Sequence, residues 1–180
     1  MNQQKSALLI VDVQVAPFIW AQYGGKELYQ GEELLHHIQS LIQKARLAAS
    51  PIIYMQHTED GESPHGLGQP LWQIHPEIAP QEGDLTMVKY HADPFLGTEL
   101  HLKLKELGIT RLIITGVQTE YCVESACRAA YSLGYANVLV SDGHSTFDSE
   151  ILTAQQIIDH HNTVLGSQFA ELMRTEEVVF

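Results

Sequence analysis

The chain has 180 residues, 44% of them apolar, and its 22 aspartates and glutamates outnumber ten lysines and arginines. This length suffices for one full hydrophobic core but not for two, so residues 1–180 are expected to form a single domain. The formal net charge of -12 repels phosphate backbones and anionic membrane surfaces. Nucleic acid and membranes are therefore excluded as expected partners.

The N-terminal segment and the cysteines predict the compartment and the redox state. The apolar run Ala7–Val11 is far shorter than a secretory or membrane-spanning segment, so a cytoplasmic location is expected. Cys122 and Cys127 are five residues apart in the chain. On one helix their Cα atoms would lie roughly 8 to 9 Å apart, which is beyond disulfide reach. Both are predicted to be free thiols.

Short β-branched runs alternate with helical patterns along the whole chain. The runs that predict buried parallel strands lie at 6–12, 51–56, 111–117, 137–142 and 177–180. The most regular helical pattern, 32–49, has acidic residues early and basic residues late, as the helix dipole favours. Three further helices are predicted: one capped by Thr98 and stopped by Gly108, one from 121 to 134, and one from 149 to 162.

This alternation predicts an α/β fold with three layers, α-β-α, around a mostly parallel, doubly wound sheet of five or six strands. Ligands in such folds bind outside the carboxyl ends of the strands, where the strand order switches. The polar residues Asp12, Gln56 and Asp142 fall at such ends. The connection 57–88 is too long for a simple crossover and is expected to fold over the site.

Cys122 is the candidate nucleophile, in the stretch TGVQTEYCVESACRAA. It is predicted to lie in the first turn of its helix, where backbone N–H groups and the positive dipole end stabilise a thiolate of low pKa. The alternative for a free cysteine is a small buried hydrophobe. Cys127 is assigned that role because it falls on the apolar face of the same helix.

Two charged residues could serve this thiol. Asp12 ends an apolar strand, so its carboxylate is expected to project into the crevice and to exchange protons near neutral pH. A structural cap is the alternative for this carboxylate. Lys89, in TMVKYH, could hold a positive charge beside both groups, although a lysine taken alone is usually a solvated surface residue.

The order and spacing of four segments are those of a known superfamily. LLIVDVQ, VKY followed by DPFLGTEL, ITGVQTEYCVESACRAAYSLGY and VLVSDGHSTFDSE resemble the isochorismatase-like superfamily of cysteine hydrolases. That superfamily includes nicotinamidases, N-carbamoylsarcosine amidases, and ureidoacrylate and biuret hydrolases. The resemblance runs from about residue 5 to about residue 165.

The resemblance implies a catalytic triad of Asp12, Lys89 and Cys122. It also implies an oxyanion hole made by the backbone N–H groups of Gln118 and Cys122, and a cis peptide bond between Val117 and Gln118. The expected activity is cleavage of a C–N bond in a small amide, ureide or carbamoyl compound through a thioester on Cys122. Asp12 would be the general base and Lys89 the supporting charge. Relatives are commonly dimers or tetramers, which implies a homodimer or homotetramer.

Departures from individual relatives narrow the expectation. Isochorismatases proper cleave a vinyl ether and lack the nucleophilic cysteine, so an isochorismatase-type reaction is the less favoured alternative. Metal-binding nicotinamidases carry an Asp-x-His pair after the second strand, where this chain reads YMQHTEDGESPH. No metal and no cofactor are therefore expected. His57, Asp60, His65 and His75 remain alternative metal ligands, but loop polarity explains them more simply.

The substrate pocket is predicted from residues that flank the triad and supply stacking faces or amide groups. The candidates are Gln14, Phe18, Gln56, Trp72, Phe95 and Tyr121. Each could equally be an ordinary core or surface residue. His144 is expected to support the site wall from a strand-end loop, and His160 and His161 to lie at the end of the last helix.

Two interpretations from other classes compete with the hydrolase. A catalytically idle binding or interaction protein could keep the same fold, and rapid alkylation of a low-pKa cysteine would distinguish the enzyme from it. A dinucleotide-binding oxidoreductase is set aside, because VDVQVAPF after the first strand contains no G-x-G-x-x-G.

Overall fold

The computed structural model describes residues 4–59, 61 and 63–180, and it contains one parallel sheet with the strand order β3-β2-β1-β4-β5-β6. The strands are β1 (Ser6–Val11), β2 (Ile52–His57), β3 (Leu85–Lys89), β4 (Arg111–Val117), β5 (Ala136–Ser145) and β6 (Glu171–Met173). The predicted α/β fold with a doubly wound sheet is confirmed. Because the chain builds outward from β1 to β3 and then returns to β4, the strand order switches between β1 and β4.

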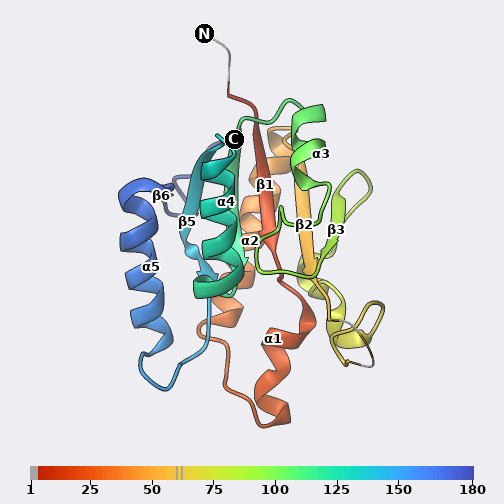
Figure 1. The fold of residues 1–180 in the computed structure, drawn as a ribbon, viewed down its shortest axis with the longest axis vertical. Coiled ribbons are helices and arrows are strands. Elements are labelled where there is room, and N and C mark those ends of the chain that lie inside the picture. Colours follow the sequence, from red (N-terminus) through yellow and green to blue (C-terminus); the bar gives the residue numbers. More distant parts are fainter. Residues whose placement is uncertain (1–3, 60, 62) are drawn as a thin grey trace.

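Helices cover both faces of this sheet (Figure 1). They are α1 (Val15–Ile19), α2 (Gly31–Leu47), α3 (Leu100–Glu106), α4 (Glu124–Ser132) and α5 (Ala154–Gln168). Apolar residues of α2 pack on one face, and those of α3, α4 and α5 pack on the other. The short α1 lies beyond the carboxyl end of β1 (Figure 1). None of the helices in the described ranges is long and apolar enough to cross a membrane.

The two-sided burial explains the continuous apolar runs. In β1, Leu9 and Val11 belong to the core under α3, α4 and α5, while Leu8 and Ile10 belong to the core under α2. Burying alternate side chains on opposite faces requires apolar residues at every position of a central strand. The continuous apolar runs in the sequence are therefore a direct consequence of the three-layer architecture.

Gly116 allows the two central strands to meet at their carboxyl ends. Its φ is 138°, and a Cβ at this position would lie 2.1 Å from the carbonyl oxygen of Val11. No other residue fits that gap without separating β1 from β4. The glycine thus keeps Asp12 and the segment after β4 on adjacent strand ends.

The boundaries of α5 differ from the prediction for a local reason. Thr153 caps the helix, since its side chain accepts a hydrogen bond from Gln156 N while the Gln156 side chain accepts one from Thr153 N. This capping box starts the helix at Ala154 rather than near 149. The helix then continues to Gln168, so His160 and His161 lie in its middle and not at its end.

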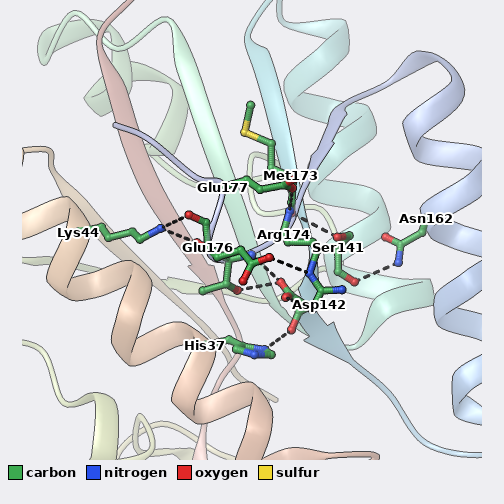
Figure 2. A network of polar contacts seen from close by, with 10 residues as sticks. His37, Lys44, Ser141, Asp142, Asn162, Met173, Arg174, Glu176 and Glu177 are labelled. Atoms are coloured by element: carbon green, nitrogen blue, oxygen red, sulfur yellow. Dashed lines mark hydrogen bonds and ion pairs between the residues drawn. The ribbon is translucent and has the colours of Figure 1, made fainter.

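The strand assignments also need two corrections. The last four residues of the predicted connection 57–88 belong instead to β3, which runs from Leu85 to Lys89 at the sheet edge, where partial burial leaves a shorter apolar run. The predicted strand 177–180 is wrong, and the last strand is the three-residue β6. Lys44 Nζ donates to the carbonyl oxygens of Thr175 (2.7 Å), Glu176 (2.9 Å) and Val178 (3.2 Å). These bonds hold the tail against α2 and occupy carbonyls that a strand would pair (Figure 2).

Candidate active site

The three residues of the predicted triad come together at the switch point of the sheet. Asp12 directly follows β1, Lys89 ends β3, and Cys122 lies in η4 (Thr119–Val123), a π-helical turn after β4. Lys89 Nζ is 2.6 Å from Asp12 Oδ2 and 3.3 Å from Cys122 Sγ. It also donates to the carbonyl oxygens of His91 (3.0 Å) and Ala92 (3.4 Å). The fully buried ammonium therefore links the carboxylate to the thiol.

The backbone of Asp12 adopts an uncommon conformation, which positions its carboxylate. Its φ is 54°, in the left-handed region, while its N–H donates to the carbonyl oxygen of Met55 at 3.0 Å. Such conformations are costly for a residue with a Cβ and are frequent at functional sites. Asp12 Oδ1 is buried and has no hydrogen-bond partner among the residues that the structure describes. One carboxylate oxygen is thus free to accept a proton.

Burial is the main influence on the protonation of Asp12 and Cys122. It raises the pKa of Asp12, against the opposing effect of the Lys89 charge. Burial, followed by the negative charge of Asp12, raises the pKa of the Cys122 thiol to about 12. The expectation of a low-pKa thiol is therefore wrong for the free protein, because desolvation and the carboxylate outweigh the favourable helix start. The resting form is the thiol, and attack requires a base.

The segment after β4 turns sharply around Gln118. The Val117–Gln118 peptide bond is cis. The carbonyl oxygen of Gln118 accepts from Tyr121 N at 3.3 Å and from Val123 N at 3.2 Å, which closes η4. The N–H of Gln118 donates to no backbone or side-chain acceptor within the described ranges. Gln118 and Cys122 line the same cavity.

A cavity of about 340 Å³ opens onto Asp12 and Cys122. The lining residues are Asp12, Gln14, Ala16, Pro17, Trp20, His57, Glu59, His65, Ala92, Val117, Gln118, Tyr121 and Cys122. Of the six predicted substrate-binding residues, Gln14 and Tyr121 are on this wall. Phe18, Gln56, Trp72 and Phe95 are not, and their assignment to the wall is corrected.

The two phenylalanines pack elsewhere because their rings find apolar partners. The Phe18 ring lies 4.6 Å from the His75 ring, between centroids, and packs against the core under α2. The Phe95 ring stacks on Tyr135 at 6.1 Å in the opposite core. Adjacency in the chain to a triad residue therefore did not give adjacency in space.

The two glutamines and Trp72 form the support of the cavity wall. Gln14 Nε2 donates to the carbonyl oxygens of Trp72 (2.7 Å) and His57 (3.0 Å), and its Oε1 accepts from His57 N at 2.9 Å. Gln56 Nε2 donates to the same Trp72 carbonyl at 3.3 Å. These bonds tie the end of β2 to the long connection that follows it.

Several wall residues were not predicted as substrate-binding. Trp20, after α1, stacks on His65 with 5.4 Å between ring centroids, and Glu59 stands on the same connection as His65. His57 Nδ1 is buried without a hydrogen-bond partner in the described part of the chain, and burial and the Lys89 charge lower the pKa of His57. The stretch APFIW, which begins four residues after Asp12 and contains two aromatic residues, was the available signal for Trp20.

The alternative metal ligands are not brought together. Within residues 4–59, 61 and 63–180, no three His, Cys, Asp or Glu side chains are grouped so that they could hold a metal ion. His57 and His65 face the cavity, whereas His75 packs on Phe18. Asp60 lies outside the described residues. The absence of a metal remains a prediction.

Comparisons with known proteins identify the family of the chain. Residues 6–177 match the isochorismatase domain. Streptothricin hydrolase from Streptomyces noursei is 32% identical over 177 residues, with 96% of this chain covered, although the chain spans only 60% of that protein's length. The uncharacterised isochorismatase family protein YrdC from Bacillus subtilis is 30% identical over 98% of this chain and 96% of its own length.

A solved structure shows the same architecture over the full length. An isochorismatase from Pseudomonas putida KT2440 superimposes with a TM-score of 0.85 at 28% identity, covering 99% of this chain and 94% of its own. The domain match extends over nearly all of the residues that form the sheet and the site. The chain therefore belongs to the isochorismatase family of hydrolases.

Proposed function

We propose that this protein is a cysteine hydrolase that cleaves a C–N bond of a small amide, ureide or carbamoyl compound. The observation that carries the proposal is the position of Lys89 Nζ, 2.6 Å from Asp12 Oδ2 and 3.3 Å from Cys122 Sγ, behind the two residues as they line an open cavity. A nucleophile, a base and a charge that orients both are the parts that covalent hydrolysis requires. The resemblance of the sequence to amide-cleaving cysteine hydrolases supports the same assignment.

The first half of the reaction forms a thioester. Asp12 takes the proton of the Cys122 thiol while Sγ attacks the carbonyl carbon and the carbonyl electron pair moves to oxygen. The N–H groups of Gln118 and Cys122 would stabilise the resulting oxyanion. When the tetrahedral intermediate collapses, the C–N bond breaks and Asp12 gives the proton to the departing nitrogen.

The second half consumes one water molecule. Asp12 takes a proton from the water molecule as the water oxygen attacks the thioester carbon, and the C–S bond breaks. The proton then returns to the Cys122 sulfur, so the thiol and the carboxylate are both regenerated. Lys89 keeps its place throughout and stabilises the negative charge as it moves between the carboxylate and the sulfur.

The charges of the cavity favour a neutral or cationic substrate. Among the described residues no lysine or arginine lines the wall, whereas Glu59 does. The Glu59 carboxylate forms no ion pair in the described part of the chain and accepts a hydrogen bond from Ser63 Oγ at 2.5 Å. Because the Lys89 ammonium behind the wall is already paired with Asp12, an anionic substrate would meet no unpaired positive charge among the lining residues, which disfavours it. Trp20 and Tyr121 offer faces for an apolar or planar body.

The proposal is tested by release of ammonia or amine from a panel of small amides and ureides that includes matched neutral, cationic and anionic members. We expect turnover of neutral or cationic members and a mass increase on Cys122 equal to the acyl group. The control is the Cys122→Ala variant on the same panel. Retention of wild-type turnover by that variant would exclude the cysteine-hydrolase mechanism.

A further inference from the structure

A buried relay connects α5 to the turn that carries Cys122. His144 is predicted in a loop but lies near the end of β5, where it is buried, and its register partner is Gly116 of β4. His144 Nδ1 is 2.8 Å from Thr119 Oγ1, and His144 Nε2 is 3.0 Å from Asn162 Oδ1. Thr119 is fully buried and is the first residue of η4.

The direction of each hydrogen bond follows from its neighbours. Asn162 Nδ2 donates to the carbonyl oxygen of Ser141 at 3.0 Å (Figure 2), so Asn162 Oδ1 faces the imidazole as an acceptor. His144 Nε2 must then carry a proton. Burial lowers the pKa of His144 to about 4, so the ring is neutral and Nδ1 holds a lone pair. The Thr119 hydroxyl is therefore the donor, and all three side chains are fixed in one orientation.

Thr119 lies in the chain between the two residues whose backbone N–H groups are proposed to hold the oxyanion. Gln118 precedes Thr119, and Cys122 follows it by three residues in the same turn. Oxyanion donors act only when they lie within a few tenths of an ångström of the charge that develops. We propose that Thr119, held by His144 and Asn162, is a positioning residue. It keeps the N–H groups of Gln118 and Cys122 in the orientation that stabilises the oxyanion. This proposal rests on the proposed function.

The test compares two reactions of Cys122. Acylation by 4-nitrophenyl acetate passes through an oxyanion, whereas alkylation by iodoacetamide is a direct displacement with no oxyanion. For Thr119→Val, which keeps the shape and removes the hydroxyl, we expect kcat for ester hydrolysis to fall about 30-fold, with KM and the alkylation rate within about twofold of wild type. Thr119→Ser keeps the hydroxyl and should stay within about threefold of wild-type kcat.

Two further variants complete the comparison. Thr146→Val removes another buried hydroxyl, one that has no hydrogen-bond partner among the described residues, and should leave both reactions unchanged. Asn162→Ala acts from α5, outside the turn, and should lower kcat in the same selective way, which provides a second measurement if Thr119→Val does not fold.

Three results would overturn the relay: wild-type kcat in both Thr119→Val and Asn162→Ala, equal loss in the valine and serine variants, or loss of alkylation in step with kcat. Failure of the proposed function looks different. In that case the ester does not acylate Cys122 of the wild-type protein, or Cys122→Ala hydrolyses it at the wild-type rate.

Discussion

Two polar clusters of this protein each join a buried or half-buried aspartate to a lysine or arginine, yet they differ in how completely their polar atoms are paired. The C-terminal cluster consists of Lys44, Asp142, Arg174 and Thr175, and Figure 2 labels the first three. Arg174 Nη2 lies 3.6 Å from Asp142 Oδ2, Asp142 Oδ1 accepts from both Thr175 N and Thr175 Oγ1 at 2.8 Å, and Lys44 donates to three carbonyl oxygens. In the candidate active site, Asp12 Oδ1 is buried without a partner in the described part of the chain.

The difference separates a cluster that stabilises the fold from one arranged for chemistry. A paired polar atom contributes about 1 kcal/mol to stability, whereas a buried unpaired one costs about 1 to 3 kcal/mol. A functional site is one place where a fold keeps such an atom, because a ligand or a proton can complete it there. The C-terminal cluster should therefore affect stability alone, and the Asp12 cluster should affect turnover first.

The largest expected effect is that of the nucleophile. Cys122→Ala removes the attacking atom, so turnover of any amide that the wild type hydrolyses should fall by about four orders of magnitude or more. Cys127→Ala is the matched control, because Cys127 is fully buried in the core under α4 and does not line the cavity. It should keep its activity and lose about 1 kcal/mol of stability. Initial rates and urea unfolding of both variants measure this contrast.

The next largest effect is expected for the general base, Asp12, whose substitution should slow turnover but speed alkylation of Cys122. Asp12→Asn cannot accept the thiol proton, so turnover should fall about 1000-fold. The charge of Asp12 raises the pKa of Cys122, and its removal beside Lys89 should lower that pKa. Alkylation by iodoacetamide at pH 7 should therefore become faster. A variant that loses both turnover and alkylation would show that the carboxylate activates the thiol in the resting state.

Stability should depend on pH through His144. Its pKa is about 4 in the folded protein and about 6.5 in the unfolded chain. Above pH 6.5 both states are neutral and stability is complete. As pH falls from 6.5 to 4 the unfolded chain binds the proton first, so the contribution of His144 to the free energy of unfolding should fall by about 3 kcal/mol. His144→Gln should flatten this slope in urea titrations, whereas His36→Gln, on the surface of α2, should not.

A smaller effect is expected in the C-terminal cluster. Asp142→Ala removes two hydrogen bonds to Thr175 and should cost about 2 kcal/mol of stability. Turnover below the unfolding transition should stay within about twofold of wild type, because Asp142 does not line the active-site cavity. A large loss of kcat at unchanged stability would mean that the two clusters are coupled.

The smallest expected effect tests the rim of the cavity. Glu59→Gln removes the carboxylate that we associate with cationic substrates, and a partly solvated charge of this kind is worth about 1 kcal/mol or less. The ratio of kcat/KM for a cationic amide to that for its neutral analogue should fall about threefold to fivefold. Glu77→Gln, outside this cavity, is the control. An unchanged ratio would remove Glu59 from substrate selection.

Local chemistry in the sequence determined the fold class and made Asp12 and Cys122 candidates, whereas the triad with Lys89 followed from the family resemblance. Continuous apolar runs predict strands buried on both faces, and a charged or nucleophilic residue directly after such a run lies at a strand end. Asp12 and Cys122 could be found in this way, because their positions depend on short stretches of chain. The same logic misassigned 177–180, since an apolar tail packed under α2 and held by Lys44 has the composition of a strand.

The resemblance predicted that the three triad residues meet, but only the tertiary structure showed through which contacts they meet and in what protonation state. Lys89 ends the edge strand β3, and nothing local shows that its ammonium reaches past β2 to Asp12 and Cys122. The raised pKa of Cys122 arises from burial and from a carboxylate 110 positions away in the chain, against a favourable local helix start. The pocket wall likewise combines α1 with the β2–β3 connection. Desolvation and through-space charge depend on the complete fold, so no local pattern in the sequence contains them.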